Sequence, residues 1–439
     1  MPKILITHAD IVTLDPQGTV LRNADVAIEG ERIVAVGQAP ADFRPDEVVE
    51  ARNHVLMPGF VNAHTHAPMT FERGWAEDLP LDRWFNERVW VVESQLTADD
   101  VYWGALLAAA EMIRSGTVAF ADHYFYMDRV AEAVEQAGLR ALLAWCVFGE
   151  EGNIGTDLPG TVDFVQRWQG AAGDRIHTVL GPHSPYMCEP RFLARTAAVA
   201  ARLGVGIHIH LAESQAQVDN SLARYDRTPV ELLEANGVFD VPVIAAHCIY
   251  VNEVDQAILA RRGVTVVQCP NCHMKLGMGV TPVPALLAQG VNVALGTDGP
   301  ASSNDLNMLK EARLAALIQK LHRADPQVMP GDLPLRMATQ NGARALGWPD
   351  SGAILPGYRA DLILLDCDKP HWRPRHDLVA NLLHSAQAGD VSDVMVAGRW
   401  LMRRRQLLTL DEQRILWEAE RRALALVDKD LTIVRAYQA

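Results

Sequence analysis

The sequence predicts an α/β protein whose main part is a (β/α)8 TIM barrel, joined to a small β-sandwich domain built from both chain ends. Eight short apolar segments alternate with helical segments through the middle of the chain, and several of them end in polar residues. Repeated strand–helix units of this kind form a parallel sheet, and eight of them close into a barrel. A doubly wound sheet is the alternative, but it accounts less well for the polar strand ends.

The eight predicted strands lie between helical segments whose ends carry capping residues. The strands are 57–66, 116–123, 140–148, 176–183, 205–213, 242–247, 264–269 and 291–298. Thr97 precedes two acidic residues, as at a helix start, and Gly116 ends the helix that follows. Gly204 and Gly263 end two further helices, 190–203 and 253–262, in the same way.

The sequence predicts mostly β-strands and hairpins at the two chain ends, unlike the alternating strands and helices of the middle. A hairpin is predicted over 25–36 with Gly30 in its turn, and a second one over 394–401. Residues 360–365 read as a strand, and 411–426 as a closing helix. We therefore expect residues 1–57 and 357–439 to form one composite β-sandwich domain with a C-terminal helix, and 58–356 to form the barrel.

Composition excludes several classes of partner. The chain has 439 residues and a formal net charge of −14, whereas binding to nucleic acid or to an anionic membrane needs a basic surface. The N-terminus shows no signal-peptide core, and no apolar run is long enough to cross a bilayer. The expected location is the cytoplasm.

Six scattered cysteines form no disulfide framework. Cys269, Cys272 and His273 match the spacing of a haem-attachment motif, and a lone pair of cysteines could also be half of a zinc site. Covalent haem requires export, and no second cysteine pair follows. We interpret this segment as the end of a strand that enters a loop.

Histidines and acidic residues gather where the predicted strands end. They are His64, His66, His183, His210, Glu213, His247 and Asp298. Active sites of TIM barrels lie at the carboxyl ends of the strands, so these side chains converge on one mouth. A lone histidine at a strand end, or a lone His-x-His, is weak evidence, but joint placement at five strand ends predicts a metal site.

Spacing within the strands suggests which residues bind the metal. His64 and His66 are two apart on one strand and therefore face the same side, which in a barrel is the interior. His210 adds a third nitrogen and Asp298 an anionic oxygen, a ligand set that suits one Zn²⁺ first and Fe²⁺ as the alternative. Glu213 follows His210 by three residues, close enough to take a proton from a bound water.

The remaining histidines fit the pattern less well. His208 faces the same interior as His210 but deeper, so we expect it to support or pack against the metal site, and the place of His123 stays open. The others are interpreted as structural: His8, His54, His177, His322, His371 and His376.

Motifs along almost the whole chain resemble one known family. The segments are 58–66, 181–186, 210–213, 246–248, 296–299 and 352–362. Together they resemble the amidohydrolase superfamily, in the branch of the methylthioadenosine/S-adenosylhomocysteine deaminases and the s-triazine hydrolases. Segments 67–70, 73–74 and 76–79 match the deaminases better.

The resemblance implies a reaction and a role for each site residue. The reaction is hydrolysis of an adenine nucleoside (5'-methylthioadenosine, adenosine or, as a further candidate, S-adenosylhomocysteine) to the hypoxanthine form with release of ammonia.

The resemblance also implies the metal ligands. One divalent metal would be bound, with no bridging lysine, by His64, His66, His210 and Asp298. His247 would hold the attacking water or the developing oxyanion, and Glu213 would move the proton. The expected substrate contacts are Trp84, Glu93, His183 and Ser302, with Glu93 at the ribose hydroxyls. A homo-oligomer is implied.

Two rival functions remain. An amino- or chlorohydrolase of s-triazines or other nitrogen heterocycles would use the same metal chemistry, but a carboxylate placed for ribose, Glu93, has no clear role there. A structural or regulatory protein on a decayed barrel should have lost a metal ligand or Glu213, and all are present.

One segment bears on substrate choice. Residues 145–157 contain no Lys or Arg, and Trp145 stands where the family's first substrate-binding arginine aligns. An amino-acid carboxylate would lack its paired cation there. We therefore expect methylthioadenosine or adenosine to be preferred over S-adenosylhomocysteine.

Overall fold

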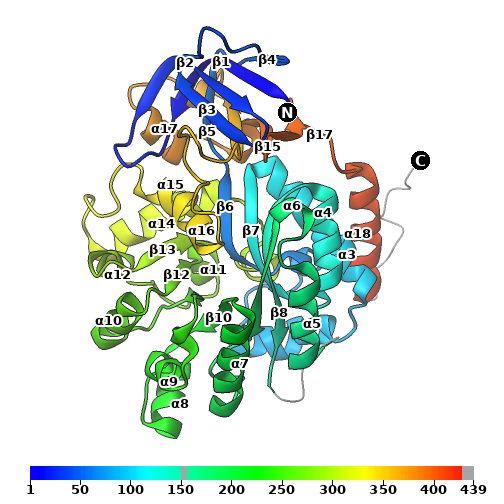
Figure 1. Ribbon diagram of the computed structural model, residues 1–439. Coiled ribbons are helices and arrows are strands. Elements are labelled where there is room, and N and C mark those ends of the chain that lie inside the picture. Colours follow the sequence, from blue (N-terminus) through cyan, green and yellow to red (C-terminus); the bar gives the residue numbers. More distant parts are fainter. Residues whose placement is uncertain (150–155, 428–439) are drawn as a thin grey trace.

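The computed structural model describes residues 1–149 and 156–427, which form two sheets stacked along one axis (Figure 1). One sheet has eight strands, and its order β13-β12-β11-β10-β9-β8-β7-β6 follows the chain. The strands are β6 (Phe60–Thr65), β7 (Thr117–Tyr124), β8 (Arg140–Val147), β9 (Ile176–Pro182), β10 (Ile207–Leu211), β11 (Val243–His247), β12 (Thr265–Gln268) and β13 (Asn292–Leu295). Every pairing within it is parallel.

The first strand of this sheet, β6, contacts the residues that directly follow the last strand, β13. The backbone nitrogen of Asp298 donates to the carbonyl of His64 at 3.1 Å, and the side chain of Asn62 exchanges hydrogen bonds with Thr297. The sheet is therefore a nearly closed barrel. All eight strands predicted from the sequence are confirmed, and so is the (β/α)8 fold class.

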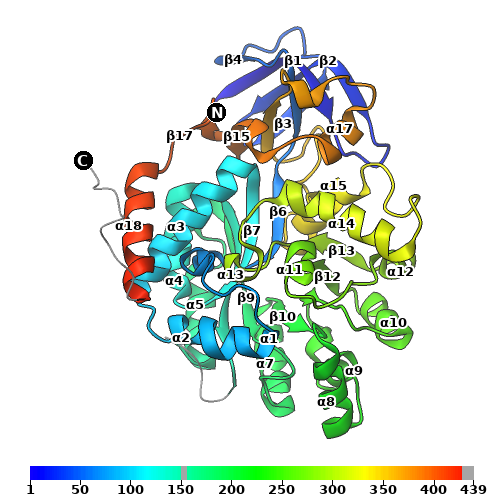
Figure 2. The ribbon, with the colours of Figure 1, turned by 180° about the vertical axis from the view of Figure 1, so that it is seen from behind.

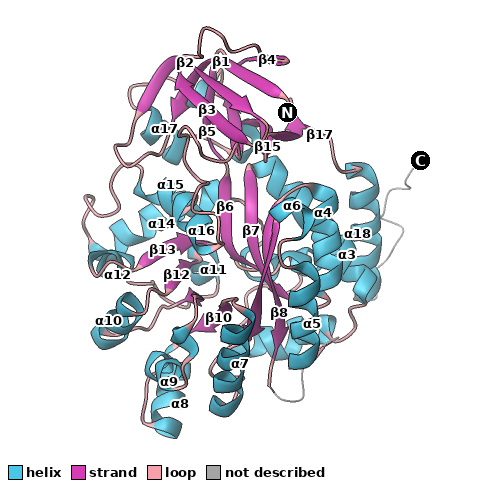
Figure 3. Cartoon of the chain, viewed as in Figure 1, coloured by secondary structure: helices cyan, strands magenta, loops and turns pink. Residues whose placement is uncertain are grey.

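Helices surround the barrel (Figure 3). The longer ones are α3 (Ala98–Ser115), α4 (Met127–Ala137), α5 (Leu158–Trp168), α7 (Pro190–Leu203), α8 (Gln215–Tyr225), α10 (Glu253–Arg261), α14 (Met308–Arg323) and α18 (Glu412–Leu426). Shorter ones are α1 (Leu81–Trp84), α2 (Trp90–Glu93), α6 (Ala171–Asp174), α9 (Pro229–Ala235), α11 (Pro270–Lys275), α12 (Val283–Ala288), α13 (Pro300–Ser303), α15 (Leu333–Met337), α16 (Gln340–Ala345) and α17 (Leu378–His384). Single turns are η1 (Ala67–Glu72), η2 (Phe85–Val89), η3 (Val238–Asp240), η4 (Pro370–Trp372) and η5 (Ala388–Asp390).

The capping signals in the sequence act as predicted. Thr97 and Asp100 form a reciprocal capping box at the start of α3, and Gly116 ends this helix in the left-handed conformation with φ 91°. Gly204 ends α7 in the same conformation. The closing helix α18 lies along α3 (Figure 2), where Arg422 contacts Asp100 at 3.0 Å.

Both chain ends build the second sheet. Its nine strands are β1 (Lys3–Val12), β2 (Val20–Glu29), β3 (Arg32–Gly37), β4 (Glu47–Glu50), β5 (His54–Pro58), β14 (Leu362–Asp366), β15 (Val391–Val396), β16 (Arg399–Arg403) and β17 (Gln406–Leu407). β5 from the N-terminal part pairs with β14 from the C-terminal part, with Leu362 opposite Pro58. Apolar residues of both parts, among them Ile6, Leu56 and Leu364, share one buried core. The expectation that both chain ends build one small β-domain is confirmed, whereas the C-terminal helix α18 packs on α3 of the barrel.

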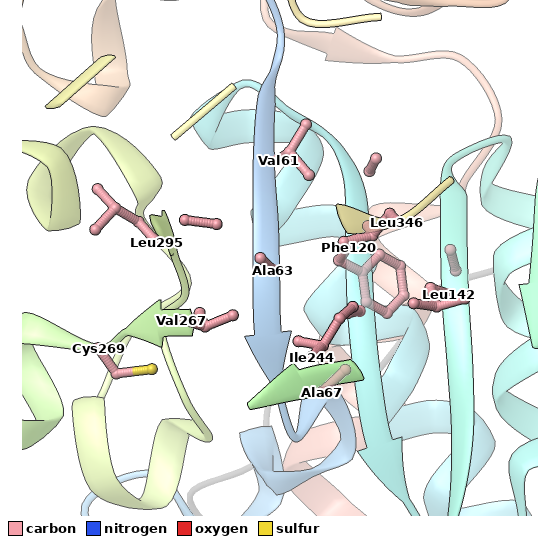
Figure 4. Packing of buried hydrophobic residues seen from close by; sticks show 14 of the residues in the cluster. Val61, Ala63, Ala67, Phe120, Leu142, Ile244, Val267, Cys269, Leu295 and Leu346 are labelled. Carbon is pink, nitrogen blue, oxygen red and sulfur yellow. The ribbon is translucent and has the colours of Figure 1, made fainter. Parts of the chain in front are cut away.

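Alternating side chains explain why the barrel holds together around a polar centre. On β6, Val61 and Ala63 face the surrounding helices, and Val61 lies against Gly342 of α16, where a Cβ would come within 2.8 Å. Figure 4 shows Val61 and Ala63 among other buried apolar side chains of the barrel, including Phe120, Leu142 and Ile244. The alternate residues of β6, Asn62 and His64, face the barrel interior.

A buried ion pair joins the two sheets at the end of the barrel where the strands begin. Arg140, the first residue of β8, donates to Asp361 through Nε at 2.9 Å and Nη2 at 3.2 Å, and both side chains are almost fully buried. The β-domain therefore covers this end of the barrel, and the carboxyl ends of the strands face away from it (Figure 1).

The cysteine-containing segment partly departs from expectation. Cys269 follows the end of β12, as predicted, but Pro270 then begins α11 instead of a loop because proline fits the first turn of a helix. All six cysteines are buried, and none of them forms a disulfide bond. Within the described residues, no helix is long and apolar enough to span a membrane.

Candidate active site

Four of the predicted metal ligands meet at the carboxyl end of the barrel. Asp298 Oδ1 lies 3.3 Å from His64 Nε2 and 3.2 Å from His66 Nε2, and His66 Nε2 lies 3.3 Å from His210 Nε2. Four ligands about 2.0–2.1 Å from a tetrahedral Zn²⁺ are separated by roughly 3.3 Å. These separations therefore suit one small divalent cation at the centre of the four atoms.

In all three histidines Nε2 is the ring nitrogen that is available to bind a metal. Nδ1 of His66 faces the carbonyl of His123 at 2.6 Å, and Nδ1 of His210 faces the carbonyl of His183 at 2.9 Å. A carbonyl only accepts, so each Nδ1 carries the hydrogen and each Nε2 offers a lone pair. Nε2 of His64 is buried and makes no hydrogen bond, which a metal ion would correct.

Burial sets the charge of this cluster. It lowers the pKa of His64 to about 4 and that of His210 well below its ordinary value, so both imidazoles are neutral and able to bind a metal. Burial opposes the charge of His66 as well, but the hydrogen bond and charge of Asp298 raise its pKa to about 9. Although burial opposes ionisation of Asp298, the contacts of its carboxylate with His64 and His66 hold its pKa well below the usual range.

Glu213 and His247 lie beside the four ligands. Nε2 of His247 is 3.4 Å from Oε2 of Glu213, and both side chains are buried. Nδ1 of His247 lies 3.1 Å from Nε2 of His273. If Nε2–H of His247 points at the carboxylate, its Nδ1 accepts from Nε2–H of His273, so the second histidine selects the tautomer of the first.

A cavity of about 570 Å³ opens from this cluster. The metal-site residues His66, His210 and Asp298 form one end of it. Aromatic and aliphatic side chains form much of the rest: Met69, Leu81, Trp84, Phe85, Trp90, Phe125, Phe148, Leu276 and Met278. Glu93, His183 and Tyr186 also line it, and none of the described lining residues is a lysine or an arginine. The cavity suits a flat ring with an uncharged extension.

Comparison with known proteins decides the family. A model of the amidohydrolase family matches residues 55–401, which include every residue of this cluster. The chain belongs to the amidohydrolase family. Amidohydrolases are hydrolytic enzymes, so this chain is a hydrolase that cleaves C–N bonds.

Curated relatives narrow the branch of the amidohydrolases. A 5-methylthioadenosine/S-adenosylhomocysteine deaminase of Pelotomaculum thermopropionicum is 46% identical over 433 residues, covering 98% of this chain and 100% of the relative. A deaminase of the same name from Desulforudis audaxviator is 48% identical over 408 residues, covering 92% and 95%. The resemblance seen in the sequence motifs is confirmed.

Solved structures agree on the fold and contain zinc. An adenosine deaminase from Xanthomonas campestris with bound zinc has a TM-score of 0.93 and 33% identity, covering 97% of this amidohydrolase and 99% of that chain. A zinc complex of atrazine chlorohydrolase from Arthrobacter aurescens has a TM-score of 0.87 and 26% identity, with coverage of 97% and 100%.

The predicted substrate contacts of this amidohydrolase fall into two groups. Trp84, Glu93 and His183 line the cavity. Ser302 does not: its hydroxyl donates to Asp298 Oδ2 at 2.6 Å, which places it behind the metal site. Burial raises the pKa of Glu93 to about 7 and lowers that of His183 to about 3.

Trp145, which aligns with the family's first substrate-binding arginine, does not line the cavity. Trp145 lies on β8 with its ring packed edge-on against Phe164 of α5, at 5.6 Å between centroids, whereas its neighbours Cys146 and Phe148 line the cavity. Side chains alternate along a strand, so only every second one can face the interior. Residues 150–155 of the same segment lie outside the described residues.

Sequence reasoning missed several partners of the site. His273 was treated as part of a strand end, yet it contacts His247. His208 contacts Nδ1 of His64 at 2.8 Å, in the supporting position that was expected, and His123 lies in the cavity wall with neither ring nitrogen bonded. Tyr186 and Gln217 both donate to Glu213. No spacing signal marks His273 or Gln217, because each comes into place through a helix after its strand.

The histidines interpreted as structural lie away from this cavity. His177 stacks on Trp348, with ring centroids 4.3 Å apart, His8 pairs with Glu50, and His371 pairs with Asp390.

Proposed function

We propose that this amidohydrolase is a metal-dependent deaminase that converts the adenine ring of a nucleoside to the hypoxanthine form and releases ammonia. The observation that carries the proposal is the joint presence of the His64, His66, His210 and Asp298 cluster and the Glu213–His247 pair. Relatives named as deaminases, which match over nearly the full length of both chains, support it.

The proposed metal ligands are His64, His66, His210 and Asp298, with one Zn²⁺ per chain as the first candidate and Fe²⁺ as the second. The donor set of three imidazole nitrogens and one carboxylate oxygen fits either ion, and His66 would give up its second proton when the ion binds. Such an ion supplies Lewis acidity, which makes water a nucleophile near neutral pH.

The proton steps are assigned to Glu213 and Asp298. Asp298 and Oε2 of Glu213 take the proton of the attacking water, and Glu213 passes it to the ring nitrogen beside the amino-bearing carbon. His247, held by His273, stabilises the developing charge on oxygen through Nε2–H. Water oxygen bonds to the carbon and forms a tetrahedral intermediate. The second proton of that oxygen then passes through Glu213 or Asp298 to the amine, the C–N bond breaks, and ammonia leaves with the oxo group formed.

The nucleoside is proposed to lie along the cavity. His183 contacts the heterocycle, Trp84 packs on the ligand, and Glu93 accepts hydrogen bonds from the ribose hydroxyls. Ser302 is proposed to act through Asp298, since its hydroxyl bonds that carboxylate. The cavity wall offers no described cation for a carboxylate tail, which favours methylthioadenosine or adenosine over S-adenosylhomocysteine.

An s-triazine hydrolase is the second candidate, supported by the fold similarity to atrazine chlorohydrolase. Glu93 argues against it, because a small triazine carries no hydroxyl pair for that buried carboxylate. The other proposals are a cytoplasmic homo-oligomer that binds neither nucleic acid nor membranes, with a β-domain of 1–57 and 357–439 and a barrel of 58–356.

A substrate screen tests the proposal. Ammonia release should be measured for methylthioadenosine, adenosine, S-adenosylhomocysteine, guanine, cytosine and melamine. We expect turnover of at least one of the three adenine nucleosides, and adenosine should be converted faster than its 2',3'-dideoxy analogue, which lacks the hydroxyls for Glu93. Turnover of melamine without any nucleoside would establish the triazine alternative.

A further inference from the structure

The carboxylate of Glu213 is held from behind by two donors on one oxygen. The hydroxyl of Tyr186 and the side-chain amide of Gln217 both donate to Oε1, the latter at 2.6 Å. Gln217 also accepts, through its own Oε1, from the backbone nitrogen of Glu213 at 3.1 Å. Its amide therefore binds both the main chain and the side chain of Glu213.

We propose that Gln217 is a positioning residue for the deamination: together with Tyr186 it occupies Oε1 of Glu213 and leaves Oε2 to carry the protons. The inference rests on the proposed role of Glu213. Oε2 is the oxygen that faces Nε2 of His247, at 3.4 Å, on the side of the metal site. A carboxylate that is already held in its reactive orientation loses less conformational entropy when the transition state forms. Positioning of this kind lowers the activation free energy more than it strengthens substrate binding.

Both donors are permanent. An amide does not titrate, and burial together with the neighbouring Glu213 carboxylate raises the pKa of Tyr186 well above its ordinary value. Tyr186 therefore keeps its hydrogen near neutral pH. The proton shuttled by Glu213 has no vacant place on Oε1, because both donors already point at that oxygen.

The two donors separate Glu213 from a second, shallow pocket. This pocket is lined by Tyr186 and Gln217, together with Asn220, Arg224 and Tyr225. Tyr186 also lines the active-site cavity, so it stands between the two spaces. Glu213 lines only the active-site cavity, on the side of His247.

The start of α8 provides a matched control. Ser214 caps this helix, and its hydroxyl accepts from the backbone nitrogen of Gln217 at 3.3 Å. Ser214→Ala loosens the same helical turn but leaves the side-chain amide of Gln217 in place. A role of Gln217 in helix stability and a role in holding Glu213 therefore give different results.

The test compares Gln217→Met, Tyr186→Phe and Ser214→Ala in the full-length metal-loaded enzyme with an adenine nucleoside that it turns over. Methionine keeps the length of glutamine and removes the donor. Because Gln217→Met removes a hydrogen bond to a charged group, it should lower kcat roughly ten- to a hundredfold. The KM, metal content and melting temperature of Gln217→Met should change little. Tyr186→Phe should also lower kcat. The kcat of Ser214→Ala should stay within about twofold of the wild type, because that hydroxyl does not contact Glu213.

A double variant separates positioning from general damage. If Gln217 acts through Glu213, then adding Gln217→Met to Glu213→Gln should change the residual kcat by less than about twofold, because coupled residues are not additive. An unchanged kcat in Gln217→Met, an equal loss in Ser214→Ala, or full additivity with Glu213→Gln would each overturn the inference. Retained turnover in Glu213→Gln alone would overturn the proposed role of Glu213 and this inference with it.

Discussion

The two ends of the barrel differ in how far their buried polar groups are paired. At the mouth, several buried imidazole nitrogens lack hydrogen-bond partners, including Nε2 of His64, Nδ1 of His208, Nδ1 of His273 and both nitrogens of His123. At the end covered by the β-domain, the carboxylate of Asp361 accepts four hydrogen bonds, two of them from Arg140, and Nη1 of Arg140 is left without a partner. The mouth is thus built to receive a ligand or ion, and the opposite end is built to stay closed.

Positive φ values, which are costly for residues other than glycine, occur at both ends. At the mouth His247 and Asp298 have φ 74° and 59°, and at the covered end Ala397, whose backbone nitrogen donates to Asp361, has φ 50°. The difference between the two ends therefore lies in the pairing of their side chains. The comparison predicts that substitutions at the mouth affect turnover, and that substitutions at the covered end affect stability.

The largest expected effect is on turnover, at the mouth. Glu213→Gln keeps the size of the side chain and removes its ability to carry a proton, so kcat should fall about 10²–10⁴-fold. Metal content and melting temperature should stay near those of the wild type. Steady-state kinetics and elemental analysis of the same sample check this, and a loss below tenfold would mean that another group moves the proton.

At the covered end the expected effect is on stability. Arg140→Met leaves Asp361 as an unpaired buried charge, which should lower the free energy of unfolding by about 3–5 kcal/mol. Urea unfolding measures this change. The value of kcat/KM for the folded protein should stay within about twofold, and a selective loss of activity at unchanged stability would break the proposed division between the two ends.

The same ion pair gives the covered end a pH dependence. Although burial opposes its ionisation, attraction to Arg140 lowers the pKa of Asp361. A carboxyl whose pKa is lower in the folded state contributes stability above its unfolded value of about 3.9, and this stability is lost as the pH falls through the folded value. The stability difference between wild type and Asp361→Asn should therefore be full at pH 7 and shrink in acid. A difference independent of pH would contradict this.

The smallest expected effect concerns substrate choice within the mouth. No described lysine or arginine lines the cavity to meet an amino-acid carboxylate, and a lost charge-assisted contact costs about 1.5–3 kcal/mol. The kcat/KM for S-adenosylhomocysteine should thus be roughly ten- to a hundredfold below that for methylthioadenosine or adenosine. If kcat/KM is instead higher for S-adenosylhomocysteine, a cationic group outside the described lining of the cavity must bind the carboxylate.

The fold could be predicted because its signals are local and repeated. The apolar strands end in polar residues, and glycines such as Gly116 and Gly204 mark helix ends, so all eight strands were found. Residues at strand ends, such as His210 and Asp298, could be placed for the same reason, since strand direction fixes where they point.

The remaining parts of the site depend on contacts that no local pattern encodes. Trp145 was assigned to the cavity by alignment, but the alternation of β8 turns it toward Phe164. His273 reaches His247 from α11, and Gln217 reaches Glu213 from the first turn of α8. Ser302 was expected at the substrate and instead bonds Asp298. Such contacts depend on how each helix packs back on the barrel.

The central claim is that one divalent metal, held by His64, His66, His210 and Asp298, is needed for deamination. The direct test measures metal by elemental analysis and ammonia release from an adenine nucleoside in protein purified without chelator, then stripped, then titrated with Zn²⁺. We expect about one metal per chain, loss of activity on stripping, and recovery that is complete at about one added Zn²⁺ per chain. Two fully occupied metals per chain, or full activity in metal-free protein, would contradict the account.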